Sequence, residues 1–218
     1  MSIWQTRMRS EAALSAELHG YREYVEGVFS RLDDVIGRFE RRQSENIFFR
    51  VCGMTIVKAR NYGLGLYSLS LDGLGQEAGA LLRPLVEAYE VLVYFRLDPT
   101  RVSQTTDGTL PSAGEIAKKI SGRFQDLRSY LNEHASHFAF SPESMTHLID
   151  FSTLEWKVKQ PYLEHPLKTN LGVLFGMLII VLIEGVNCLS AGGAVSIDDL
   201  TTDIETFRDE GISFLRNP

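Results

Sequence analysis

The residue types that could do acid–base or phosphate chemistry gather toward the end of one helical pattern. Arg128 and His134 stand six positions apart, and Tyr130, His134 and His137 follow at steps of four and three, on one helix face. A histidine titrates near neutrality and serves as general acid or base, and an arginine can fork onto a phosphate. These residues, with Asn132 between them, form a candidate catalytic site.

The same histidines fit two other interpretations. Protonated histidines favour the C-terminus of a helix, where they cap carbonyl groups and complement the macrodipole, so a purely structural role stays open. His134 and His137 also have i,i+3 spacing, but two histidines need further ligands to hold a metal ion. No such ligands can be placed from the sequence, and we expect no metal here.

A second polar stripe crosses an apolar helix expected over residues 75–97. Arg83, Glu87, Glu90 and Tyr94 follow at steps of four, three and four among leucines and valines. Burying a charge costs on the order of several kcal/mol unless the charge is paired. Two interpretations stay open, an Arg83–Glu87 pair that fixes the helix register and the polar wall of a cleft.

The charge of the chain is uneven. The net charge is −6 and the pI is about 5.4, which argues against a protein that coats nucleic acid with its whole surface. One basic zone lies over residues 38–60, and it either attracts phosphates or is a solvated helix junction. The last helix is acidic, and its first acidic residues suit a helix N-terminus.

The elements that position these side chains are expected to be helices. Apolar residues recur at three- and four-residue steps over most of the chain, and Ser112 with Glu115 forms a capping box. Pro84 should kink the helix that carries the polar stripe. Period-two character over residues 153–160 predicts a short strand or extended arm within an irregular segment near 138–166. The expected helices span residues 10–42, 45–71, 75–97, 113–136, 167–190 and 196–215, with a polar loop over 99–112.

This pattern predicts a mostly all-α fold, an irregular bundle of about six helices in a single domain over residues 1–218. The apolar run over 171–183 is shorter than the about 20 residues of a membrane span, so we expect a buried central helix and no membrane. The first residues lack the apolar stretch of a signal peptide, and Cys52 and Cys188 fit buried thiols. We therefore expect a cytoplasmic protein.

The common cofactor motifs are missing from the sequence. It contains no glycine-rich dinucleotide or P-loop motif, no HExxH and no GxSxG. We therefore expect no cofactor, and the usual nucleotide-binding, zinc-protease and serine-hydrolase functions are excluded.

The Arg-x5-His pattern of Arg128 and His134 resembles the Arg-x4–6-His motif of the HEPN superfamily, metal-independent ribonucleases of toxin–antitoxin and phage-defence systems. Ser129 matches the polar residue that commonly follows the arginine in that family. The resemblance implies that a ribose 2′-OH attacks the adjacent phosphate, with His134 as base or acid and Arg128 stabilising the phosphorane. It also implies a homodimer, because these enzymes complete the cleft by dimerising.

A second resemblance is broader. Residues 75–99 and the later helix end over 129–137 are similar to a widespread bacterial helical family of unknown function, whose members carry a comparable LLRxLxEA segment. The similarity covers only part of the chain. It implies a helical fold and no established activity, and it marks Arg83, Glu87 and His134 as positions of interest.

The leading hypothesis is a HEPN-like RNA-cleaving protein of bacterial defence or stress response that acts without a metal. Its catalytic residues would be Arg128 and His134, supported by Arg83, Glu87, Tyr130, Asn132 and His137. The first alternative is a non-catalytic helical subunit that binds a protein partner, such as an antitoxin or a system subunit. The second alternative is a helical bundle that binds a small molecule or lipid.

Overall fold

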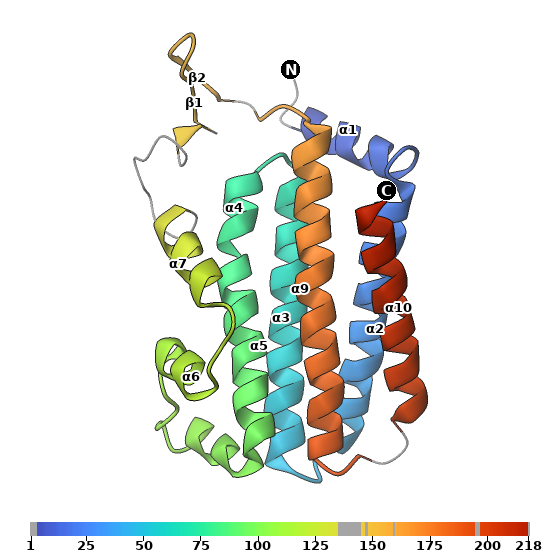
Figure 1. Cartoon of the computed structure of the whole chain (residues 1–218), viewed down its shortest axis with the longest axis vertical. Coiled ribbons are helices and arrows are strands. Elements are labelled where there is room, and N and C mark those ends of the chain that lie inside the picture. The colour runs from blue at the N-terminus through green and yellow to red at the C-terminus, as the bar shows by residue number, and fades with distance from the viewer. Residues whose placement is uncertain (1–3, 135–144, 147, 159, 195–196, 218) are drawn as a thin grey trace.

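Helices dominate the described residues, as the recurring apolar positions predict (Figure 1). The prediction of a mostly all-α bundle is confirmed. The computed structural model describes residues 4–134, 145–146, 148–158, 160–194 and 197–217. Its elements are α1 (Gln5–Leu14), α2 (His19–Arg42), α3 (Ile47–Leu71), α4 (Gly75–Ala80), α5 (Leu82–Leu97), the 3-10 helix η1 (Pro99–Thr105), α6 (Ala113–Lys119), α7 (Gln125–His134), β1 (Ile149–Asp150), β2 (Glu155–Trp156), α9 (Glu164–Ala191) and α10 (Asp198–Arg216).

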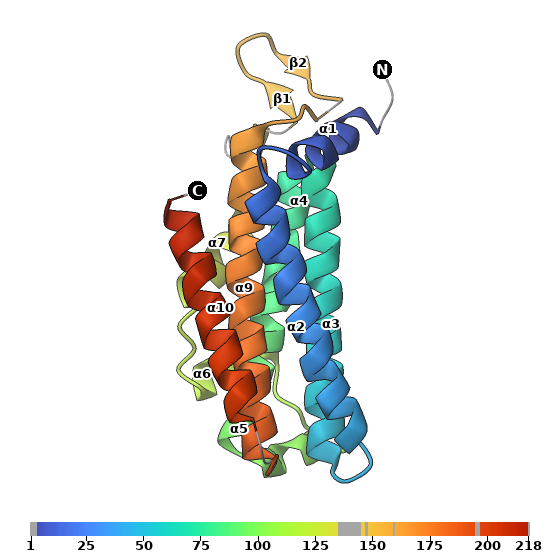
Figure 2. The ribbon, with the colours of Figure 1, turned by 90° about the vertical axis from the view of Figure 1, so that its right-hand side faces the viewer.

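The apolar helix α9 lies in the centre of the bundle, where its composition favours it. It packs against α2, α3 and α5 (Figures 1 and 2), and Leu171, Leu178 and Leu182 have no exposed surface. Among the described helices, α9 alone is long and apolar enough to cross a membrane, and 67% of its most apolar stretch is buried in the bundle. A core helix of a soluble protein has the same properties, so the cytoplasmic location and the lack of a membrane span stay predictions.

The helix expected over residues 10–42 is two helices, because α1 lies across the end of the bundle while α2 runs along it (Figure 2). Arg7 of α1 donates two hydrogen bonds of 2.7 Å to the carboxylate of Asp72, and one of 2.8 Å to the carbonyl of Ser68. These contacts join segments more than 60 positions apart in the chain. A local sequence pattern cannot indicate them.

The helix expected over residues 75–97, with a kink at Pro84, is two helices that meet three residues before Pro84. α4 ends at Ala80, Leu81 lies between the two helices, and α5 begins at Leu82. Pro84 therefore stands in the first turn of α5. Backbone N–H groups in a first turn have no partner within the helix, so a proline there removes no hydrogen bond.

The prediction of a single helix over residues 113–136 is wrong, because the structure has two helices there, α6 and α7. The capping box that begins at Ser112 is confirmed. Beyond α6, Ser121 adopts a φ of 52°, and the N–H of Gly122 donates to the carbonyl of Ala117 at 2.8 Å. This is the geometry of a Schellman motif, in which one residue in the left-handed region ends a helix.

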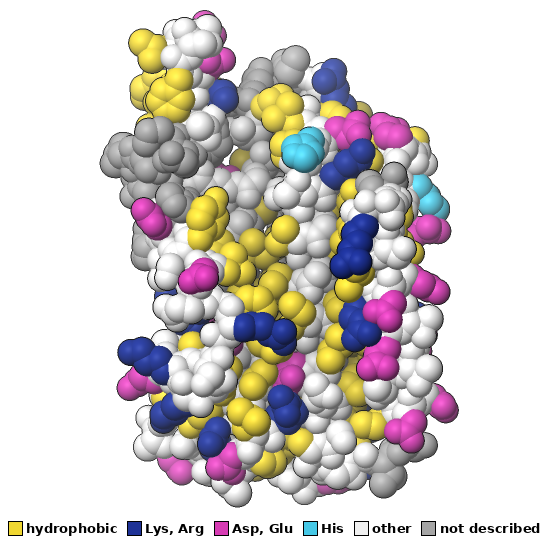
Figure 3. Space-filling view, viewed as in Figure 1, with side chains coloured by type: hydrophobic (Ala, Val, Ile, Leu, Met, Phe, Trp, Pro, Cys, Tyr) yellow, Lys and Arg dark blue, Asp and Glu magenta, His cyan; other side chains and the backbone are white. Residues whose placement is uncertain are grey.

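The irregular segment near 138–166 contains the antiparallel hairpin of β1 and β2, which projects from one end of the bundle (Figure 1). β2 agrees with the strand expected over residues 153–160. We call residues 149–158, which include this hairpin, the arm. The arm carries exposed apolar side chains (Figure 3), among them Trp156 at 82% exposed and Val158 at 87%. Residues 138–144 of the expected segment lie outside the described part of the chain.

The acidic helix α10 packs on α2 and α9 through a cluster of aromatic rings. The ring of Tyr24 lies 5.0 Å from that of Phe214 and 5.7 Å from those of Phe207 and Phe175, measured between centroids. Gly211 makes the close approach possible, because a Cβ atom at this position would lie 2.2 Å from the ring of Phe175. The distance between α9 and α10 therefore depends on this glycine.

Candidate functional site

The first part of the candidate site is an ion pair between α5 and α7. The guanidinium of Arg128 donates to one carboxylate oxygen of Glu90 and, at 3.3 Å, to the carbonyl of Ala113. The side chain of Glu90 is 1% exposed and that of Arg128 is 10% exposed. The second carboxylate oxygen of Glu90 has no hydrogen-bond partner among the described residues. Burial raises the pKa of Glu90, and the charge of Arg128 partly offsets this rise.

A second link between the same helices lies closer to the surface. Arg83 donates to the carboxylate of Glu87 at 3.1 Å and also to the side-chain oxygen of Asn132 on α7. Four of the seven residues that the sequence singled out are thus held between α5 and α7. Two residues of the polar stripe of α5, Arg83 and Glu90, thus contact α7. We refer to Arg83, Glu87, Glu90, Arg128 and Asn132 as the polar network.

Other sequence-selected residues lie apart from this network. Tyr130 is 59% exposed. Tyr94, at the far end of the polar stripe, is buried and donates to the side chain of Gln104 at 3.0 Å. The backbone of His134 ends α7, whereas its side chain and the whole of His137 lie outside the described residues.

The geometry of Arg128 bears on its expected catalytic role. Its guanidinium is occupied by Glu90 and by a backbone carbonyl, and the pair is almost closed to solvent. A phosphate would have to displace a buried carboxylate to reach it, and an unpaired buried carboxylate is costly. This arrangement favours a positioning role for Arg128, while its catalytic role, and that of His134, stays a prediction.

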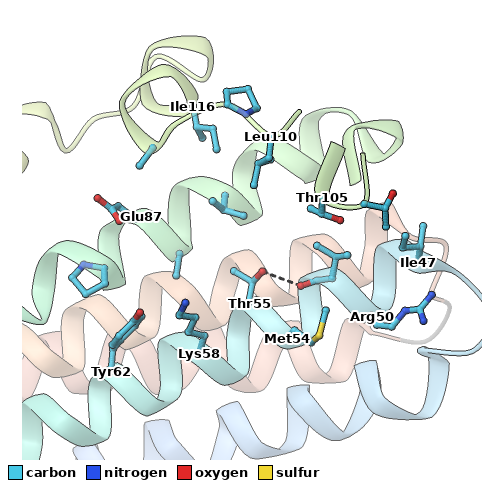
Figure 4. A pocket seen from close by; sticks show the side chains of 17 residues that line it. Ile47, Arg50, Met54, Thr55, Lys58, Tyr62, Glu87, Thr105, Leu110 and Ile116 are labelled. Carbon is cyan, nitrogen blue, oxygen red and sulfur yellow. Dashed lines mark hydrogen bonds between the residues drawn. The ribbon is translucent and has the colours of Figure 1, made fainter. Parts of the chain in front are cut away.

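The second part of the candidate site is a pocket of about 740 Å³ beside the network. It lies between α3, α5 and the segment from η1 to α6 (Figure 4). Apolar side chains form most of its wall, for example Met54 from α3, Val91 from α5 and Ile116 from α6. Glu87 lines the pocket as well, so the pocket and the polar network share a residue.

Two cations without a carboxylate partner among the described residues stand at this pocket, and the ammonium of one of them, Lys58, lies 5.9 Å from the ring centroid of Tyr62. Arg50 and Lys58 lie on α3 with Met54 between them, and Figure 4 shows all three along one row of the helix. Within the described part of the chain, neither cation has a carboxylate at ion-pair distance, and both are exposed. Glu87, by contrast, is paired with Arg83. The pocket therefore has a positive local charge in an acidic protein.

Sequence reasoning missed the pocket. Its walls come from three segments that are distant in the chain, and one of them is the loop before α6. The signal that pointed toward it was the basic zone over residues 38–60, to which Arg50 and Lys58 belong. Two other cations of that zone are engaged differently: Arg60 pairs with Asp33, and Arg42 lies over the ring of Phe49.

No metal-binding cluster occurs in the described part of the chain, where no three histidine, cysteine or carboxylate side chains come together. Cys52 and Cys188 are buried and not linked by a disulfide. Cys188 donates to the carbonyl of Leu92 at 3.5 Å, and its hydrogen bond with Cys52 together with burial raises the pKa of its thiol. These thiols belong to the core and not to the candidate site.

Comparisons of the chain with models of protein families, with curated proteins and with solved structures found no match. The resemblance to the HEPN superfamily therefore depends on the motif of Arg128 and His134 alone. The functional argument has to come from the geometry of the pocket and the network.

Proposed function

We propose that the protein binds a small, largely apolar molecule in the pocket between α3, α5 and α6. The observation that carries this proposal is the pocket itself, whose volume of about 740 Å³ lies within the range of ligand sites. Its wall is mostly apolar with a few polar groups, which is the usual composition of such sites. This is the small-molecule alternative among the functions that the sequence left open.

Exposed apolar side chains at the mouth of the pocket support the same function. Met54 is 59% exposed and Leu110 is 38% exposed, and both side chains line the pocket. A ligand in the pocket would remove this surface from water, which is favourable by about 25 cal/mol for each Å² of apolar area.

The test is to fill the pocket and measure binding. Val91 lines the pocket, whereas Val173 is exposed on α9 outside it, so Val91→Phe and Val173→Phe add the same group in different places. Purified protein is titrated with 1-decanol and with decanoate by calorimetry, and native mass spectrometry looks for a copurified molecule. We expect binding of at least one probe, lost in Val91→Phe and kept in Val173→Phe. Absence of binding by both probes, with no copurified molecule, would overturn the proposal.

A second candidate function, metal-independent RNA cleavage, has one specific observation in its favour. Arg83, Glu87, Arg128 and Asn132 come together at α7, whose last residue is His134. Arg83 is the more accessible of the two arginines, with a side chain 33% exposed. In this function His134 takes the proton of the ribose 2′-OH, the 2′-oxygen attacks the adjacent phosphorus, and an arginine stabilises the charged phosphorane. The P–O5′ bond then breaks, the protonated His134 returns its proton to the leaving 5′-oxygen, and a 2′,3′-cyclic phosphate and a 5′-hydroxyl result.

The nuclease hypothesis is tested by RNA cleavage in EDTA with wild-type protein, His134→Ala, Arg128→Lys and Arg83→Gln. Circular dichroism first verifies that each variant is folded, because Arg128 pairs with a buried carboxylate. Cleavage that leaves cyclic phosphate ends and is lost in His134→Ala would support the hypothesis. Wild-type protein that leaves RNA intact would rule it out.

A further inference from the structure

The charge of the pocket indicates which kind of ligand it binds, and this inference rests on the binding function proposed above. We propose that the pocket binds an anionic amphiphile, a molecule with an apolar body and one carboxylate or phosphate head. The apolar body lies along α3 between Arg50 and Lys58, and the head pairs with one of these two cations.

The first argument is the local charge balance. Arg50 and Lys58 have no carboxylate at ion-pair distance within the described ranges, while the carboxylate of Glu87 is neutralised by Arg83 at 3.1 Å. A neutral ligand would leave Arg50 without a counter-charge in the described part of the chain, and Lys58 with only the ring of Tyr62, whose centroid lies 5.9 Å from the ammonium. An anionic head supplies that counter-charge, and a charge-assisted hydrogen bond is about twice as strong as a neutral one.

The second argument is the spacing along α3. Arg50 and Lys58 are eight residues apart, which is roughly 12 Å at a rise of 1.5 Å per residue. Met54 lies midway between them on the same row, and Ile116 of α6 lies across the pocket from it (Figure 4). Val91 of α5 also lines the pocket. The pocket thus has two cations along α3 with apolar surface between them and beyond them, and this matches a molecule with a charged head and an apolar body.

The third argument is the charge of the remaining molecule. The chain has a net charge of −6, so the protein as a whole repels an anion at long range. The acidic helix α10 packs on α2 and α9, whereas the pocket lies between α3, α5 and α6. The pocket with its two cations is therefore a more favourable site for an anionic amphiphile than the surface of the acidic helix α10.

The experiment compares probes that share one tail. Calorimetry measures the dissociation constants of 1-decanol, decanoate and decyl phosphate for wild-type protein, Lys58→Gln, Arg50→Gln and Arg41→Gln. Arg41 lies in the same basic zone, is exposed and does not line the pocket, so Arg41→Gln is the matched control. We expect at least one anion to bind wild-type protein about tenfold more tightly than the alcohol. This preference should disappear in Lys58→Gln or Arg50→Gln and persist in Arg41→Gln.

The outcomes separate the inference from the binding function. Alcohol and anions of equal affinity, or an anion preference unchanged in both Lys58→Gln and Arg50→Gln, would overturn the inference while the pocket still binds. No binding by any probe would overturn both. Stronger binding of decanoate indicates a fatty-acid-like ligand and stronger binding of decyl phosphate a phosphate ester, and either result supports an anionic amphiphile. Thermal midpoints of the variants verify that lost binding is not lost folding.

Discussion

Glu90 and Arg128 form the most buried ion pair of the described residues, and most of the energetic consequences at the residue scale follow from it. Removing two charges from water is expensive, and their attraction repays this cost only with good geometry and further hydrogen bonds. Arg128 has a second acceptor in the carbonyl of Ala113, but one oxygen of Glu90 has none among the described residues. The pair therefore fixes how α7 sits on α5 more than it adds net stability.

Removing the arginine should destabilise the protein strongly. Arg128→Met leaves the buried carboxylate of Glu90 unpaired, so we expect the free energy of unfolding to fall by about 3–5 kcal/mol. Urea denaturation measures the loss. Arg83→Met is the control, because Arg83 pairs nearer the surface and its loss should cost about 1 kcal/mol or less. The double variant Glu90→Leu/Arg128→Met should recover most of the loss, and failure to recover would contradict this account.

The same pair predicts how stability depends on pH. Because the folded-state pKa of Glu90 is raised by burial, Glu90 binds a proton more readily in the folded protein than in the unfolded chain. Its stabilising contribution is therefore complete below the unfolded pKa, about 4.3, and is lost as pH rises through the folded pKa. Without Arg128 this folded pKa lies still higher, since Arg128 lowers it.

Arg128→Met should accordingly be closer to wild-type stability near about pH 4.5 than near about pH 7.5, because Glu90 is then protonated. Urea denaturation at both values measures the difference. Adding Glu90→Gln to Arg128→Met should remove the extra pH dependence. A destabilisation that is equal at both values would show that the loss has another origin than the charge of Glu90.

At the scale of helices, the sequence predicts helix boundaries that depend on neighbouring residues, and it does not predict those that involve residues distant in the chain. The capping box at Ser112 and an interruption of the helix near Pro84 depend on neighbouring residues, and both were predicted. The division of residues 10–42 depends on Arg7 reaching Asp72, which no local pattern shows. The end of α6 was missed because the left-handed residue is Ser121, where such a position usually holds glycine.

The end of α6 gives a prediction for this scale. Ser121→Gly should stabilise the protein by about 1 kcal/mol, since a left-handed conformation is strained in serine and free in glycine. Gly122→Ala should destabilise it by about 1–3 kcal/mol, because its Cβ would lie 2.8 Å from the unpaired oxygen of Glu90. Thermal and urea denaturation measure both changes.

Gly114→Ala is the control for these variants, since a Cβ at Gly114 in α6 meets nothing within 4 Å. Its effect should stay within about 0.5 kcal/mol. A lower stability of Ser121→Gly would contradict the left-handed conformation of residue 121 that ends α6.

For the whole molecule, the sequence predicts the class of fold and several candidate residues, but it does not predict the pocket beside which they lie. Arg83, Glu87, Arg128 and Asn132 were selected from their types and spacing, and the structure brings them together. The pocket could not be predicted, because its walls converge only when the loop before α6 lies against α3. The expected homodimer and the protein or RNA partner stay predictions that a single chain does not test.

The assembly of α10 on the bundle gives a prediction at this scale. Gly211→Ala places a Cβ atom 2.2 Å from the buried ring of Phe175, so α10 has to move away from α9. We expect a loss of about 1–3 kcal/mol and faster hydrogen exchange along α10. Gly176→Ala on α9, where a Cβ meets nothing within 4 Å, should instead be neutral or stabilising by about 0.5–1 kcal/mol. Equal stability of the two variants would show that α10 is not held at this distance.

The projecting arm has a consequence for the spectroscopy of this protein. The chain has two tryptophans, and Trp4 is 57% exposed while Trp156 on the arm is 82% exposed. Both indole rings already meet water in the folded state, so their emission should change little when the helical core unfolds. Tryptophan emission should instead change when a molecule covers the arm or the start of the first helix. Circular dichroism is therefore the better measure of unfolding. Trp156 thus serves as an intrinsic fluorescent reporter of any molecule that docks on the arm.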